Sequence, residues 1–271
     1  SGLGLVDTYL VVEEISKVDM LTALMVHDQN VSPRIIANYG PDALKQRLIP
    51  AFVKGELECS IAWTEPQAGS DATAITTSAV RDGDDYIING QKVFTTFGDR
   101  VDMHLVYARF GGGKGAKGIG TIIVERDRPG VKVYPLEKKM GVRGANENQL
   151  FFDNVRVPAS NVVTQGDPSS SKGFVQPLTV YNATRVGMGV MAMGVAEGAF
   201  DLAREYMTVR EQFGQKLCEM QGLRWMMSDM LIDIEAARCL CYKALAAVDA
   251  GKPDPCLSSI AKVFATEMAQ K

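Results

Sequence analysis

The sequence contains five cysteines and two histidines, residue types that often bind metal ions or act as nucleophiles. Cys239 and Cys241 are too close together for a zinc-type pair, and the other cysteines are isolated. His27 and His104 are too few for a histidine-rich metal site. We therefore predict no metal site and expect free thiols of a cytoplasmic protein, or of a mitochondrial matrix protein in a eukaryote.

A glycine-rich segment, "GGGKGAKG" at residues 111–118, has a composition that could cradle a phosphate group. A dinucleotide-binding loop lies between a strand and a helix and has an acidic residue further along the chain. Here, β-type sequence flanks the glycines on both sides, at 101–110 and 119–127. The segment is therefore predicted to be a flexible hairpin connection.

The overall composition is that of a folded globular protein. Hydrophobic residues make up 46% of the 271 residues, enough to bury a large core. The 29 basic and 32 acidic residues give a net charge of −3, which argues against a general nucleic-acid binder. An uninterrupted apolar run of about 18 residues is absent, so we expect no membrane span.

The first 57 residues are predicted to be mainly helical. Apolar residues recur at helical spacing over 7–28. A second helix is expected over 41–54, beginning at Pro41 and kinked or ended by Pro50. This segment is interpreted as a partial N-terminal helical domain, 1–57.

Residues 58–166 have a β-type pattern. Strands are expected on both sides of "RDGDD" (81–85), with a tight turn at Asn89-Gly90. Further short runs of Val, Ile, Thr and aromatic residues follow without intervening helices. The pattern predicts an antiparallel barrel or sandwich.

Residues 167–271 are predicted to form a partial helical bundle. A polar linker over 164–173 precedes expected helices at 175–211 and 219–250. The first is rich in glycine and alanine, which would let neighbouring helices approach closely. The chain begins at a residue other than Met and ends in an uncapped helical pattern, so we expect it to be truncated at both ends.

Four segments carry a resemblance to a known family. They are "TEPQAGSD" (64–71), "GQKVFTTFG" (90–98), "KKMGVRGANENQLFFDNVRVPASNVV" (138–163) and "REQFGQKLCEMQGLRWMMSDM" (210–230). Their types and order resemble the motifs of the acyl-CoA dehydrogenase family over essentially the whole chain. The resemblance implies an α+β fold with N-terminal helices, a central antiparallel β-barrel domain and a C-terminal helical bundle.

The resemblance also implies a reaction. Members of the family bind FAD between the β domain and the helical bundle and dehydrogenate an acyl-CoA thioester. A carboxylate removes the α-proton, hydride leaves Cβ for the flavin, and the electrons then pass to an electron-transfer flavoprotein. A homotetramer and a role in degrading fatty or other carboxylic acids are expected from the same resemblance.

The resemblance assigns residues around the flavin ring. Trp63 and Thr64 would present backbone and hydroxyl groups to it, and Thr96 would lie near N5. Phe94 stands where the family has a tryptophan flanking the ring, and Phe97 stands where it has an asparagine. Together with Trp63 in place of a small aliphatic residue, these differences predict an atypical pocket wall.

The resemblance places Arg210 and Phe213 near the cofactor of a neighbouring subunit, with Gln221 as a further cofactor-side amide. Those contacts would require at least a dimer.

On the substrate side, Ser70 matches a position that contacts the pantetheine arm, and Arg185 matches an arginine near the nucleotide end. Asn182 stands where an aspartate is frequent in the family. The usual glutamate base lies beyond residue 271, and the alternative position for it is Thr184, which cannot act as a base.

Asp28 is the candidate catalytic carboxylate within the chain. It occupies a position where the family often has an asparagine, and some relatives that act on alicyclic thioesters take an aspartate base from this region. Asp28 would act as base or as a polar specificity group, or else lie on the surface beside His27. A short, branched or cyclic acyl group is the expected substrate.

Other readings of the same residues stay open. Glu65 is interpreted as structural, bonding to local backbone. The alternatives to a dehydrogenase are an acyl-CoA oxidase, a flavoprotein lyase of the same fold that lacks the base, and a catalytically inactive scaffold or fragment.

Overall fold

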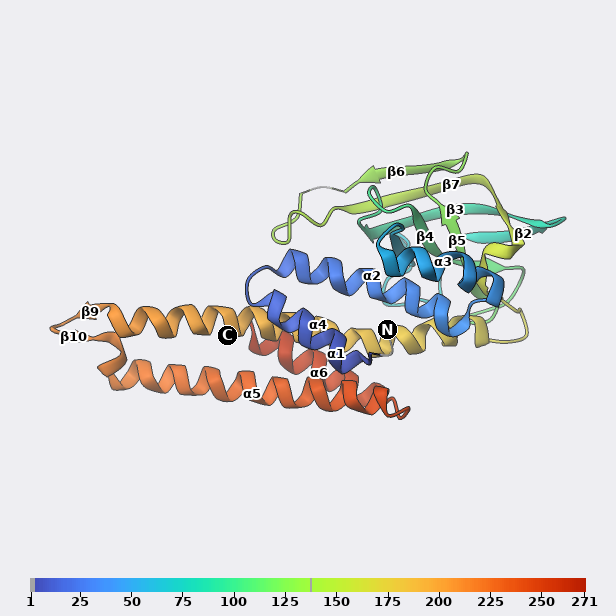
Figure 1. Ribbon diagram of the computed structural model, residues 1–271. Helices are drawn as coiled ribbons and strands as arrows, with labels where there is room; N and C mark the ends of the chain where they lie inside the picture. The colour runs from blue at the N-terminus through green and yellow to red at the C-terminus, as the bar shows by residue number, and fades with distance from the viewer. Residues whose placement is uncertain (1–2, 137) are drawn as a thin grey trace. The chain divides into compact units, whose positions relative to one another are not determined.

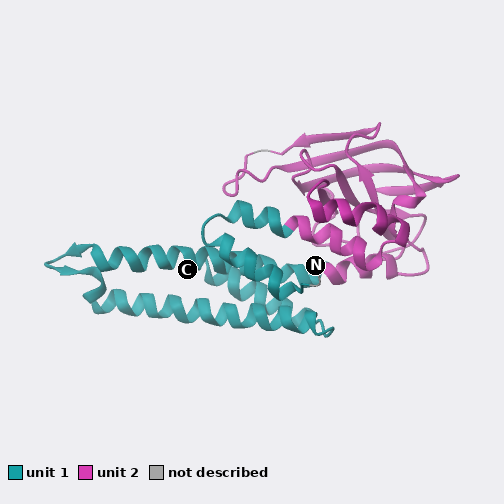
Figure 2. Cartoon of the chain, viewed as in Figure 1, with its two compact units in different colours: residues 1–27, 181–271 teal, residues 28–180 magenta. Residues whose placement is uncertain are grey.

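The computed structural model describes residues 3–136 and 138–271, and the chain divides into two compact units. Unit 1 contains residues 1–27 and 181–271, and unit 2 contains residues 28–180 (Figure 2). Two helices, α2 (Met20–Tyr39) and α4 (Lys172–Val209), contribute residues to both units.

Unit 1 is helical apart from one short hairpin. It contains α1 (Leu5–Ser16), the start of α2, most of α4, α5 (Gln221–Asp249) and α6 (Pro255–Met268). The strands β9 (Glu211–Gln212) and β10 (Gln215–Lys216) form the hairpin, which a single 3-10 turn (Leu217–Glu219) connects to α5. Helices α4 and α5 run side by side in opposite directions, and the hairpin joins their ends (Figure 1).

Glycines of α4 allow the close helix packing expected from the sequence. A Cβ atom on Gly187 would lie 2.3 Å from Cε1 of Tyr9, and one on Gly198 would lie 2.2 Å from the carbonyl oxygen of Lys17. Because no side chain fits into those spaces, these glycines bring α1 and the residues that follow it against α4.

The helix expected over 7–28 is two helices. The chain breaks after Ser16, and α2 begins at Met20. The Asp19 carboxylate accepts hydrogen bonds from the backbone N–H groups of Leu21 and Thr22, which caps the new helix. The apolar spacing alone did not reveal this cap.

Unit 2 contains α3 (Asp42–Lys54) and an eight-stranded sheet. Its strands are β1 (Cys59–Ala62), β2 (Ser78–Asp82), β3 (Asp85–Thr96), β4 (Met103–Phe110), β5 (Ile119–Glu125), β6 (Val131–Pro135), β7 (Glu147–Pro158) and β8 (Val162–Thr164). A short 3-10 turn (Ala159–Asn161) links β7 to β8. Buried residues of α2 and α3 pack with Leu105 and Ile123 on one face of the sheet.

The sheet is open. Its strand order is β6-β7-β3-β2-β4-β5-β8, with β1 also paired to β4, so β6 and β8 are the ends of the path among the described residues. Buried residues of seven strands nevertheless share one apolar cluster, which requires the sheet to curl. The α+β fold is thus confirmed, but the barrel is not closed, and two strand pairs, β1–β4 and β2–β4, are parallel.

Two local expectations also change. The Asn89-Gly90 pair lies inside β3 at a register shift and is not a turn; the turn between β2 and β3 lies at Gly83. Gly90 is required there because a Cβ atom would lie 2.4 Å from Oγ1 of Thr77. Helix α3 continues through Pro50 and ends before Gly55, whose φ is 72°.

Helix α4 is long and apolar enough to cross a membrane by length and composition alone. Its residues Val186, Val190 and Met193 are completely buried in the unit 1 core. A core helix passes the same test, and the packing of α4 accounts for its apolar character.

Candidate active site

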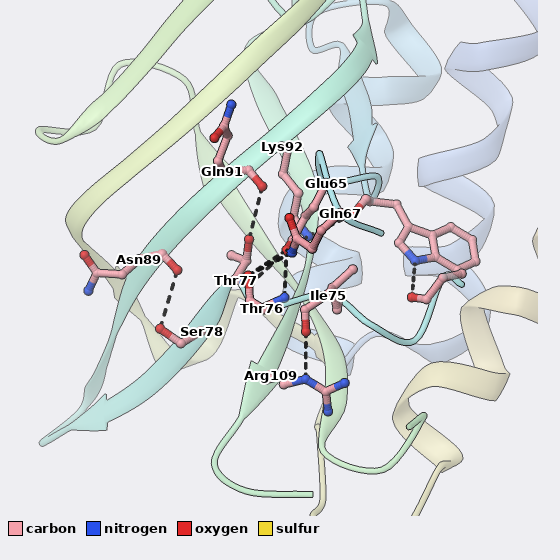
Figure 3. Close-up of polar contacts among 12 residues, drawn as sticks. Glu65, Gln67, Ile75, Thr76, Thr77, Ser78, Asn89, Gln91, Lys92 and Arg109 are labelled. Carbon is pink, nitrogen blue, oxygen red and sulfur yellow. Dashed lines mark hydrogen bonds and ion pairs between the residues drawn. The ribbon is translucent and has the colours of Figure 1, made fainter. Parts of the chain in front are cut away.

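A buried ion pair holds the signature segment against β3. Nζ of Lys92 lies 2.8 Å from Oε1 of Glu65, and both side chains are almost completely buried. Glu65 also accepts hydrogen bonds from the backbone N–H groups of Thr76 and Thr77 (Figure 3). Glu65 therefore has a structural position, as the sequence suggested.

The charges of this pair stabilise each other, which lowers the pKa of Glu65 and opposes the fall in the pKa of Lys92 that burial causes. Burial alone would raise the pKa of Glu65, but Lys92 and the hydrogen bonds to Thr77 and Thr76 lower it to about 2. Burial lowers the pKa of Lys92 to about 8, and Glu65 only partly opposes this. The pair fixes the loop that carries Trp63 and Thr64.

Backbone and ring contacts fix Trp63 and Thr64. The Trp63 carbonyl accepts a hydrogen bond from Lys92 Nζ at 2.9 Å, and the Thr64 carbonyl accepts one from the Val93 N–H. The Trp63 indole stacks on Tyr107 with ring centroids 4.5 Å apart and donates its N–H to the Ala72 carbonyl. The indole is thus part of an apolar cluster within unit 2.

The end of β3 is irregular where the motif 90–98 passes. The pairing with β7 shifts between Lys92 and Thr95, and Phe94 and Phe97 have φ values of 55° and 56°. Phe97 is buried, whereas the Phe94 side chain is 66% exposed. A bulky residue in this left-handed region carries backbone strain, which typically persists at functional sites.

Thr96 lies beside an acidic residue of the neighbouring strand. Thr96 and Glu147 are register partners in the β3–β7 ladder. The Thr96 hydroxyl is 3.2 Å and 3.3 Å from the two carboxylate oxygens of Glu147 and donates its hydrogen bond to them. Nζ of Lys139 lies 3.3 Å from the same carboxylate.

The charges of this cluster act on Asp28. Its side chain is half-buried on α2. Burial, and to a smaller extent the negative charge of Glu147, raise the pKa of Asp28 to about 7, although the positive charge of Lys139 opposes the rise. Asp28 therefore changes protonation near neutral pH, as a general base requires.

Sequence reasoning missed Glu147 and Lys139. Both lie within the motif 138–163, but only the strand register places Glu147 opposite Thr96. Glu147 and Lys139 also line a cavity of about 360 Å³, together with Lys138 and Arg143. The charged lining and the threonine hydroxyl make this part of unit 2 the candidate active site.

The proposed cofactor residues of unit 1 gather at the α4–α5 hairpin. Arg210 follows the end of α4, Phe213 lies in the turn between β9 and β10, and Gln221 begins α5. All three are exposed. Phe213 is 95% exposed at a φ of 55°, and Gly214 follows it with a φ of 77°. A strained, exposed phenylalanine has no role in the unit 1 core.

The substrate-side residues have ordinary surroundings. Ser70 is exposed in the loop between β1 and β2. Asn182 is half-buried on α4, and Nη1 of Arg185 donates to the Ser259 hydroxyl at 3.3 Å. Thr184 is buried, and its hydroxyl donates to the Tyr181 carbonyl.

The cysteines and acidic residues form no metal site within 3–136 and 138–271. All five cysteines are free thiols, and no group of three or more His, Cys, Asp or Glu side chains in those ranges could hold a metal ion.

Three family descriptions match consecutive parts of the chain. The N-terminal, middle and C-terminal domains of acyl-CoA dehydrogenase match residues 1–56, 60–155 and 171–271. The chain belongs to the acyl-CoA dehydrogenase family. The domain boundaries after residues 57 and 166 stay a prediction.

Curated relatives cover all or nearly all of the chain. Cyclohex-1-ene-1-carbonyl-CoA dehydrogenase of Syntrophus aciditrophicus is 40% identical over 100% of this chain and 65% of its own length. Cyclohexane-1-carbonyl-CoA dehydrogenase of Geobacter metallireducens is 37% identical over 96% of this chain and 67% of its own length. The chain thus spans about two thirds of the length of these relatives.

Solved structures of the family have the same fold. Butyryl-CoA dehydrogenase from Megasphaera elsdenii is 34% identical with a TM-score of 0.89, over 96% of this chain and 67% of that chain. A chain from a structure described as the electron transferring flavoprotein of Acidaminococcus fermentans is 36% identical with a TM-score of 0.91, over 99% of this chain and 70% of that chain.

The family is FAD-dependent, and the described residues fit such a cofactor in each unit. A flavin needs an apolar surface for its ring and hydrogen-bonding groups at its polar edge. In unit 2, the exposed ring of Phe94 offers the apolar surface, and the hydroxyl of half-buried Thr96 offers the hydrogen-bonding group. Both residues lie at the irregular end of β3. In unit 1, Arg210 and Phe213 offer a cation and an exposed ring for the pyrophosphate end.

Proposed function

We propose that this protein dehydrogenates an alicyclic acyl-CoA thioester, with FAD as cofactor and Asp28 as catalytic base. The observation that carries the proposal is the half-buried Asp28 carboxyl, whose pKa of about 7 is set by burial and by Glu147. The cyclohexene and cyclohexane carbonyl-CoA dehydrogenases among its relatives support the cyclic substrate class.

The chemistry requires a base for one proton. In the reaction, the α-carbon loses a proton to the Asp28 carboxylate, Cβ loses a hydride, and a carbon–carbon double bond forms. Bound FAD supplies the acceptor for the hydride. A carboxyl that changes protonation near neutral pH is basic enough to take the proton and remains ionised in part of the population.

Side chains of both units would hold the reactants. Trp63, Thr64, Phe94 and Thr96 would contact the flavin ring, and Arg210, Phe213 and Gln221 would reach the cofactor of a partner subunit in a homotetramer. Ser70, Asn182 and Arg185 would bind the coenzyme A moiety.

An electron-transfer flavoprotein is the proposed electron acceptor, and the structure described as such from Acidaminococcus fermentans supports it. The cytoplasmic or mitochondrial matrix location stays a prediction.

The test is an anaerobic absorbance titration of the full-length, FAD-loaded protein with cyclohexanecarbonyl-CoA, cyclohexenecarbonyl-CoA and butyryl-CoA. We expect the flavin band to bleach with a cyclic thioester in stoichiometric amount. Bleaching with butyryl-CoA alone would contradict the cyclic class, and no bleaching with any thioester would contradict the dehydrogenase.

Asp28→Asn tests the base separately. We expect single-turnover flavin reduction to slow by at least about 100-fold, the usual contribution of a general base. Asp84→Asn, at an exposed position in the β2–β3 turn, is the matched control and should reduce flavin at the wild-type rate. A normal rate in Asp28→Asn would place the base elsewhere.

A further inference from the structure

The Glu147 carboxylate interacts with two groups of the proposed site: it contacts the Thr96 hydroxyl, and its charge acts on Asp28. Both of its oxygens lie within 3.3 Å of the Thr96 hydroxyl. Its position follows from the β3–β7 register, and its side chain is only 18% exposed. Glu147 therefore has little freedom to move away from Thr96.

The same carboxylate acts on Asp28. The charges of Glu147, on β7, and of Lys139, in the segment between β6 and β7, both act on the Asp28 carboxyl on α2, and their effects on its pKa have opposite sign. Because Glu147 repels a second negative charge, Asp28 holds a proton more tightly in its presence. Lys139 pairs with Glu147 and weakens that repulsion.

We propose that Glu147 and Lys139 are positioning residues of the dehydrogenation site: Glu147 orients the Thr96 hydroxyl and places its negative charge in the electrostatic environment of Asp28, and Lys139 pairs with that charge. The proposal rests on the proposed function, since it assigns roles relative to Asp28 and Thr96.

The contact with Glu147 also decides what Thr96 can offer a ligand. Burial raises the pKa of Glu147, and Lys139 and the Thr96 hydroxyl oppose that rise. In its ionised form the carboxylate only accepts hydrogen bonds, so the Thr96 hydroxyl then donates its proton to Glu147. The threonine oxygen then remains available as an acceptor for an N–H group. Without Glu147, the hydroxyl is free to donate instead, which favours a ligand atom that carries no proton.

The first experiment measures the pH dependence of single-turnover flavin reduction by cyclohexanecarbonyl-CoA in the full-length, FAD-loaded protein. Glu147→Gln keeps the size and a hydrogen-bond acceptor but removes the charge. We expect the rising limb of its pH profile to move down by roughly one pH unit. Lys139→Gln should move the same limb up.

Glu125→Gln is the matched control. Glu125 is also half-buried in the sheet and paired with a cation, Arg128. It lies outside the proposed active site and is not among the residues proposed to bind the cofactor. Its pH profile should equal that of the wild type. Shifts of the Glu147 and Lys139 variants in the same direction, or no shift in either, would overturn the proposal.

A second readout needs no turnover. The carboxyl ¹³C signal of Asp28, assigned by its loss in Asp28→Asn, should titrate near pH 7 in the wild type and at lower pH in Glu147→Gln. An unchanged midpoint overturns the proposal even in an active enzyme. A flavin that no thioester bleaches would instead remove the proposed function, whatever the Asp28 signal does.

The variants also test the two roles separately. Glu147→Leu removes the acceptor of the Thr96 hydroxyl, and we expect the midpoint potential of the bound flavin to fall relative to Glu147→Gln. Equal potentials in the two variants would contradict the orientation of Thr96. If Glu147 variants do not fold, the Asp28 signal in Lys139→Gln decides: a higher midpoint supports the proposal and an unchanged one overturns it.

Discussion

Nζ of Lys92 lies 2.8 Å from Oε1 of Glu65, and the two side chains are 0% and 2% exposed. Lys92 also donates to the Trp63 carbonyl, and Glu65 accepts from the Thr76 and Thr77 backbone. This pair therefore ties the signature segment to β3 from inside the sheet. Trp63 and Thr64 owe their positions to it.

Glu65→Gln should lower the free energy of unfolding by about 3–5 kcal/mol, because it leaves Lys92 buried without its counter-charge. Urea denaturation measures the effect. Asp201→Asn, which breaks the exposed Asp201–Arg204 pair on α4, is the control and should change stability by less than about 1 kcal/mol. A Glu65→Gln loss as small as that of the control would contradict the role of the pair.

The wild type should also lose stability in acid through Glu65. Its pKa is about 2 in the folded protein and 4.5 in its ordinary state, so the folded state binds fewer protons between these values. This contribution is fully present above about pH 4.5 and is lost as the pH falls toward 2. Unfolding curves of wild type and Glu65→Gln should converge over that range; parallel curves would exclude Glu65 as the cause.

Asp28 should give stability the opposite dependence on pH. Its pKa is about 7 in the folded protein against 3.8 ordinarily, so the folded state binds more protons between pH 4 and 7 and becomes less stable as the pH rises. Asp28→Asn should therefore be more stable than wild type at pH 8, by on the order of 2–4 kcal/mol, and equal to it near pH 4. Thermal unfolding at both pH values checks this. A variant less stable at pH 8 would show that Asp28 has a stabilising partner.

Arg210→Ala should lower flavin occupancy and leave the fold intact, because Arg210 is exposed. Loss of a charge-assisted contact of about 1.5–3 kcal/mol weakens flavin binding roughly tenfold or more. The ratio of flavin to protein absorbance measures occupancy. Arg204→Ala, also exposed on α4, is the control. Unchanged occupancy in Arg210→Ala would remove the argument for a cofactor contact across subunits.

Phe213→Gly should raise stability and weaken flavin binding together. Glycine adopts the φ of 55° without strain, which relieves on the order of 1 kcal/mol. The lost ring removes the expected cofactor contact. Phe213→Ala separates the two effects, because it loses the ring but keeps the strain. Melting temperature and flavin content measure them; full flavin content in both variants would assign the ring no role there.

Many features of this protein can be predicted from its sequence. The helical ends, the β-type middle and the four motifs were all recognisable, because hydrophobic periodicity and short motifs are local properties. The prediction of a turn at Asn89-Gly90 was wrong because the same dipeptide also suits a β-bulge. Only the pairing between β3 and β7 distinguishes a turn from a bulge. The predicted closed barrel was also wrong: the sheet is open. Closure depends on hydrogen bonds between strands that are remote in the sequence, so the local pattern does not indicate it.

The sequence by itself determined the family, the order of elements and the residue types available to a flavin and a thioester. The tertiary structure decided what those residues do. Strand register puts Glu147 beside Thr96, burial and the charge of Glu147 raise the pKa of Asp28, and a completely buried lysine holds Glu65. Ionisation and hydrogen-bond direction depend on neighbours in space, and neither can be read from spacing along a chain.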